Sequence, residues 1–204
     1  MKVKHMAAVA AFVAVLSPLE SQAAPPQFRF VDARAMDVAG VKLGMDYNQA
    51  LAAAAAHFGV TPDKIKPEQY PHKDDITGQK LPRYFNYEKD GVSLEVSFEV
   101  RLPADKAHPL AVAGVRYAIP WTNENQNSVR RAALEKYGSP TGNFGGVTQW
   151  CDTLENPRNP GMGCSMAHAK LWLGPLAGIT LEDPSYHEAI LKYINEQKSR
   201  KPNF

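Results

Sequence analysis

The amino-acid sequence predicts an α+β fold, in which helices pack against an antiparallel sheet. Residues 92–100 alternate strictly between apolar and polar after an Asp-Gly turn, which indicates a β-hairpin. Candidate strands follow each candidate helix in runs, the order typical of antiparallel sheets. A short pattern, VAGVK at 38–42 and VAGVR at 112–116, precedes a helix pattern twice. We therefore expect two α-β-β-β units and a C-terminal helix.

The first helix is expected at residues 47–58, where Leu51, Ala54 and Phe58 recur at helical spacing. Asp46 and Gln49 have the spacing of a capping box, in which each side chain bonds a free main-chain amide of the first turn. Gly59 is expected to end the helix in a left-handed conformation.

Strands are expected next at residues 84–88 and 92–100, joined by the turn at 89–91, and then around Val115, Tyr117 and Ile119. Val92, Leu94 and Val96 share one side of the hairpin, while Ser93 and Glu95 share the other. One side of the predicted sheet should therefore face the core and the other should face water.

The second helix is expected at about residues 124–137, with a capping box at Asn123 and Gln126 and an end at Gly138. Short strands should follow at 147–151, 169–173 and 179–181. Asp183 and Pro184 then mark the start of a final helix, since proline suits the first helical position.

Residues 1–23 have the pattern of a cleavable export signal, with Lys2 and Lys4 before an apolar stretch and a small-x-small site ending at Ala23. The remaining chain divides into units at 24–110 and 111–204, which we expect to pack as one compact domain. The expected location is the periplasm, or beyond it by secretion. No cysteine lies near the cleavage site, so no lipid anchor and no membrane attachment are expected.

The charge balance argues against a partner that is bound through the overall charge of the protein, such as nucleic acid or an anionic membrane. The formal net charge is +2, and removal of the signal leaves +1, because it takes two of the 23 basic and one of the 21 acidic residues. A nearly neutral chain offers no general attraction to nucleic acid or to an anionic membrane.

Cys151 and Cys164 are expected to form a disulfide in an oxidising compartment. A thiol or metal pair is the alternative. Met162, Cys164, Met166 and His168 fall at every second position, and on a strand they would share a face with ligands suited to copper(I). The disulfide is favoured, because it removes Cys164 as a ligand.

Catalytic motifs are missing from the sequence. There is no Gly-x-Ser-x-Gly, and Ser139 is better explained by the helix stop before Pro140. The glycines at 142–146 lack the Gly-Lys-Ser/Thr of a phosphate loop. The carboxylates are scattered, unlike the placed pair of a glycosidase. We expect a protein without a cofactor, and a hydrolase is the least favoured interpretation.

Residues 40–45 (GVKLGM), which lead into a helix, and residues 133–140 (ALEKYGSP) carry a family resemblance. They are similar to the helix-plus-antiparallel-sheet modules of SmpA/BamE-like and beta-lactamase-inhibitor-protein-like envelope proteins. The resemblance covers most of residues 38–183 as two units, although residues 119–121 (IPW) replace the usual Leu-Gly-Met. It implies a binding protein that inhibits secreted enzymes or helps to assemble envelope complexes.

The sequence therefore favours a non-catalytic binding protein, an inhibitor or immunity protein that occludes another periplasmic or secreted protein. The expected contact surfaces are a sheet face and the loops at 60–82 and 152–163. Candidate contact residues are Trp121, Tyr70, His72, Asp74 and Asp75. Core or sheet-edge packing is the favoured explanation for the three tryptophans, Trp121, Trp150 and Trp172. An envelope-assembly or stress-related factor ranks second, and a copper-binding protein third.

Overall fold

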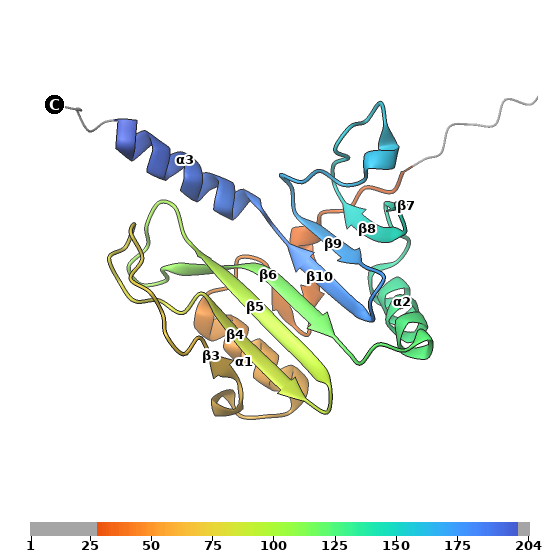
Figure 1. Cartoon of the computed structure of the whole chain (residues 1–204), viewed down its shortest axis with the longest axis horizontal. Helices are drawn as coiled ribbons and strands as arrows, with labels where there is room; N and C mark the ends of the chain where they lie inside the picture. Colours follow the sequence, from red (N-terminus) through yellow and green to blue (C-terminus); the bar gives the residue numbers. More distant parts are fainter. Residues whose placement is uncertain (1–27, 200–204) are drawn as a thin grey trace, which may run out of the picture.

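The computed structural model describes residues 28–199, so the predicted signal at 1–23 lies outside the described residues. It is an α+β protein with three α-helices and an antiparallel sheet (Figure 1). The helices are α1 (Tyr47–Phe58), α2 (Asn123–Tyr137) and α3 (Ser185–Ser199). Within the described range, no helix combines the length and apolar composition that crossing a membrane requires.

The eight strands of the main sheet lie in the order β3-β4-β5-β6-β10-β9-β8-β7, and every neighbouring pair is antiparallel. In chain order they are β3 (Lys66–Pro67), β4 (Tyr84–Lys89), β5 (Val92–Val100), β6 (Leu110–Ala118), β7 (Gly142–Phe144), β8 (Val147–Cys151), β9 (Lys170–Leu173) and β10 (Gly178–Glu182). The predicted boundary at residues 110 and 111 coincides with the start of β6, which pairs with both β5 and β10.

The repeated word in the sequence does not form the same structure twice. Residues 38–42 belong to a small hairpin of β1 (Asp37–Val38) and β2 (Val41–Lys42), which turns at Ala39 and Gly40 with positive φ angles of 53° and 77°. Residues 112–116 lie in the interior of β6. The expectation of a strand at 38–42 equivalent to that at 112–116 is therefore wrong.

Helix α1 has the predicted bounds, and its capping box at Asp46 and Gln49 is confirmed. Gly59 ends it with a φ of 61°. Ala50, Ala54 and Ala55 are buried, so the helix backbone lies close to the sheet. Aromatic rings pack against the sheet at both ends of α1. The ring centroids of Tyr47 and Phe98 are 5.1 Å apart, and those of the stacked rings of Phe58 and Tyr87 are 4.2 Å apart.

Helix α2 starts one residue earlier than predicted, and its predicted capping box is wrong. Thr122 is the N-cap, and its hydroxyl accepts a hydrogen bond from the Asn125 amide. The Gln126 side chain instead donates to the carbonyl of Pro175. The C-terminal end rests on Trp150, which is fully buried and donates through Nε1 to the Gly138 carbonyl at 3.0 Å. Core packing of Trp150 is thereby confirmed.

One apolar core runs under the whole sheet. The inward-facing row Phe85, Val96, Val115, Leu181, Leu171 and Trp150 crosses six neighbouring strands, and each of these residues is fully or almost fully buried. Burial of such side chains stabilises a fold by about 1.5–3 kcal/mol each.

The predicted disulfide joins Cys151 and Cys164, with 6.0 Å between the Cα atoms. The two cysteines are 13 positions apart, so the bond closes the loop between the end of β8 and the segment before β9. Both cysteines are buried, and the bond is compatible with an exported chain.

Replacement of both cysteines by alanine should lower the free energy of unfolding by about 2–4 kcal/mol, because the unfolded chain gains the freedom of the opened loop. Urea denaturation followed by tryptophan fluorescence measures the change. The wild-type protein in a strong reductant is the matched control, and it should unfold at nearly the same urea concentration as the variant. An unchanged midpoint in both would contradict a stabilising role for the bond.

Candidate functional site

The strand register decides which side chains lie on the sheet face away from the core, because neighbours along a strand point to opposite faces. One row of cross-strand partners on this outer face is Asn86, Glu95, Arg116, Thr180, Trp172 and Gln149. The next row is Tyr84, Ser97, Gly114, Glu182, Lys170 and Cys151. The two rows form a mainly polar surface with two large aromatic rings, those of Tyr84 and Trp172.

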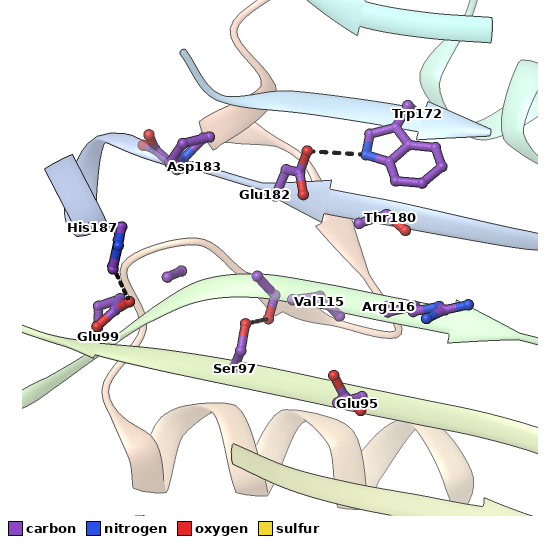
Figure 2. Close-up of a pocket in the computed structure, with 13 residues that line it drawn as sticks. Glu95, Ser97, Glu99, Val115, Arg116, Trp172, Thr180, Glu182, Asp183 and His187 are labelled. Carbon is purple, nitrogen blue, oxygen red and sulfur yellow. Dashed lines mark hydrogen bonds and ion pairs between the residues drawn. The ribbon is translucent and has the colours of Figure 1, made fainter. Parts of the chain in front are cut away.

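A groove of about 500 Å³ lies on this outer face, over the central strands β5, β6 and β10 (Figure 2). Its polar lining residues are Glu95, Ser97, Glu99, Arg116, Thr180, Glu182, Asp183 and His187, and Trp172 contributes an indole. Gly114 keeps the floor low, because a Cβ atom there would lie 2.6 Å from Ser97 Oγ. We name this groove the outer groove.

The disulfide-bonded loop lies on the same face of the sheet as the outer groove, but no residue from Cys151 to Cys164 lines the groove. The Cys164 amide donates to Gln149 Oε1 at 2.8 Å, so the loop lies on the outer side of β8. Lys170, which is buried, lies 3.5 Å from the Glu182 carboxylate and 3.2 Å from the Met166 sulfur. Glu182 also accepts from Trp172 Nε1 at 3.2 Å, which fixes the indole at the groove edge.

The opposite wall begins with α3. His187 Nδ1 lies 3.1 Å from Glu99 Oε1 (Figure 2). Arg83 Nη1 lies 3.2 Å from the other oxygen of the same carboxylate. Arg83 also pairs with Asp74. A chain of charged groups therefore connects the loop at 60–82 to the groove and to α3.

Asp74 is buried, with 5 % of its side chain exposed, whereas Tyr70, His72 and Asp75 are exposed. The Asp74 carboxylate accepts hydrogen bonds from the amides of Ile76 and Thr77 at 3.0 and 2.7 Å. The structure thus gives Asp74 a role in shaping the loop. None of the four lines the outer groove.

An apolar cavity of about 260 Å³ adjoins the outer groove and shares Arg116, Trp172 and Thr180 with it. Trp121 and Leu176 line this cavity, and each is 59 % exposed. Trp121 is therefore exposed and not a core residue, which removes core packing from the two explanations favoured for it. Gln126 Nε2 holds the β9–β10 turn beside the start of α2 through its 2.6 Å bond to Pro175.

The soft ligands expected for copper do not share a strand face. Met162 ends a short helix at Pro160–Met162, and Gly163 has a φ of 83°. Cys164 is in the disulfide, His168 Nδ1 lies 3.4 Å from Asp152, and Met162 and Met166 are 57 % and 65 % exposed. The geometric premise of a copper site is therefore wrong. In residues 28–199, no three His, Cys, Asp or Glu side chains gather in a metal-binding group.

Two pairs of side chains in the outer groove bond each other, His187 with Glu99 and Trp172 with Glu182. Ser97 Oγ donates to the Gly114 carbonyl at 3.4 Å. The groove presents hydrogen-bonding groups, charges of both signs and an indole ring, all of which can contact a binding partner.

No family model, curated protein or solved structure matches this chain. The fold and the site together define an α+β protein with one helix-covered sheet face and one face that carries a polar groove.

Most of the outer groove could not be located from sequence. The alternation at 92–100 does place Glu95, Ser97 and Glu99 on the water side of β5. Arg116, Thr180, Glu182 and Trp172 reach the same groove only because β6 pairs with β10, a strand more than sixty residues later. No short-range signal gives that pairing.

Replacement of Arg83 by methionine should lower the free energy of unfolding by about 1–3 kcal/mol, because the buried Asp74 loses its ionic partner. Lys64→Met is the matched control: Lys64 and Asp63 are 66 % and 69 % exposed, and an exposed pair contributes little. Urea denaturation at pH 7 measures both. Equal losses in the two variants would show that the Asp74–Arg83 pair has no special role.

Proposed function

We propose that this protein is an exported, non-catalytic binding protein that occludes another periplasmic or secreted protein, as an inhibitor or an immunity protein does. The observation that carries this proposal is the outer groove beside the exposed Trp121 and Leu176. A large indole exposed next to a concave surface is typical of contact surfaces, where tryptophan, tyrosine and arginine supply most of the binding energy.

The rigidity of the site supports the proposal. The bonds of Glu182 to Trp172 and Lys170 hold one side of the outer groove, and the bonds of Glu99 to Arg83 and His187 hold the other. A surface that is ordered before binding loses less side-chain and loop freedom when a partner arrives, so more of the contact energy appears as affinity.

The charges of the site would supply selectivity. Glu95 and Arg116 are cross-strand partners on the outer face, and both are exposed. A partner must present charges in the matching order to pair with both, and a wrong partner meets repulsion. Together with the predicted export signal, these features favour a protein partner outside the cytoplasm.

The two halves of the chain are proposed to be copies of one α-β-β-β unit. The supporting observation is the sheet order: β4, β5 and β6 follow α1, whereas β8, β9 and β10 follow α2, and the two sets run outward from the β6–β10 pair. The proposed equivalence of the two halves rests on this strand order and not on the sequence pattern that residues 38–42 and 112–116 share.

Trp121→Ala should weaken the partner's affinity at least thirty-fold, equivalent to about 2 kcal/mol, because the variant loses an aromatic anchor. The partner is first captured from periplasmic extract of the source bacterium by the immobilised protein and identified by mass spectrometry. Calorimetric titration with the purified partner then gives the affinities.

Leu134→Ala is the matched control, because Leu134 is 40 % exposed on α2 and lines neither the outer groove nor the cavity beside it. Its affinity should stay within about two-fold of the wild type. Capture of no specific protein, or equal losses in both variants, would count against a binding surface at this place. The partner's own activity, measured with and without the protein, separates inhibition from assembly.

A further inference from the structure

A second cavity lies on the opposite, helix-covered side of the sheet. It has a volume of about 240 Å³, and we name it the inner groove. Its floor is made by Tyr117 and Ile179, which are cross-strand partners of β6 and β10. The two helices lie over different halves of the sheet (Figure 1), and the cavity lies between His57 at the end of α1 and one side of α2.

Small side chains leave the inner groove unfilled. Helix α2 presents Val129, Ala132 and Ala133 to it, and the β1–β2 hairpin closes one end with Val38 and Ala39. Larger residues at the two helix alanines would occupy the space, as they do in a close-packed interior. The lining is thus almost entirely apolar and aromatic, the composition of small-molecule sites.

The polar groups that line the inner groove include Lys136 and His57, and Tyr117 contributes a hydroxyl whose pKa is raised by burial. Lys136 Nζ donates to Asp37 Oδ2 at 2.7 Å and to the Asp37 carbonyl at 3.1 Å, so one of its three N–H donors remains for a ligand. The Gly40 amide also donates to Asp37 Oδ2, at 3.0 Å. Tyr137 is also engaged, since its hydroxyl donates to the Asp37 carbonyl at 2.7 Å.

Donor groups around an apolar cavity complement a ligand that has an apolar body and an acceptor at one end. The volume lies below the 300–1,000 Å³ typical of drug-sized ligands, so the cavity suits one or two rings. We propose that the inner groove binds a small aromatic carboxylate, with its rings on Tyr117 and Ile179 and its carboxylate towards Lys136 and His57. This site is independent of the outer groove and of the function proposed for it.

The test is a titration of the oxidised protein with 2-naphthoate, followed by ¹H–¹⁵N NMR. Saturable shifts are expected for the amides of Val38, Tyr117, Ala133 and Ile179. Ala132→Phe, which fills the cavity, should raise the apparent Kd at least ten-fold. Ala52→Phe is the matched control: Ala52 is exposed on α1 and does not line the cavity, so its Kd should change less than two-fold.

A second titration with 2-naphthalenemethanol keeps the rings and removes the charge, and it should give a Kd at least three-fold higher. Equal affinity for the alcohol would overturn the assignment of an anionic ligand. Absence of saturable shifts, shifts centred on other residues, or equal losses in the two phenylalanine variants would overturn the site itself. Unfolding midpoints of both variants, measured in urea, confirm that the compared proteins are folded.

Discussion

The antiparallel pairing of β6 with β10 is the constraint on which the rest of this structure depends. It joins residues 114–118 to residues 178–182 and so merges the strands that follow α1 and those that follow α2 into one sheet. Its register also fixes the faces: Val115 and Leu181 point into the core, while Arg116 and Thr180 point outward. A slip of one residue would exchange these faces for every strand beyond it.

Both proposed sites follow from this single pairing. On the outer side it places the hydroxyl and guanidinium groups of β6 and β10 between the acidic residues of β5 and the indole of β9. On the inner side it places Tyr117 beside Ile179, where neither helix fully covers them. The two grooves therefore share their central strands but expose opposite chemistry, polar outside and apolar inside.

Local signals in the sequence predicted local structure well. The bounds of α1, its capping box at Asp46 and the Asp90-Gly91 turn are all confirmed, because each depends on residues within one turn or hairpin. The cysteine pair is also confirmed. The class of fold could be predicted from the order of helices and strands, although each run contains one strand more than expected, β3 in the first and β7 in the second.

Sequence reasoning failed where distant contacts override local preference. Asn123 has the right side chain to cap α2, yet the preceding Thr122 does so, because the helix begins one residue earlier. The alternation from Met162 to His168 suggested a strand, but Gly163 and the disulfide bend the segment into a loop. Asp74 looked like an exposed loop residue, and only the contact with Arg83 explains its burial.

The β6–β10 pairing is tested most directly by the cross-strand nuclear Overhauser effects between residues 114–118 and 178–182 in the oxidised protein. We expect cross-strand effects in the register that places Tyr117 opposite Ile179 and Val115 opposite Leu181. Contacts shifted by one residue, or pairing of β6 with a different strand, would move the groove residues to other faces and contradict both proposed sites.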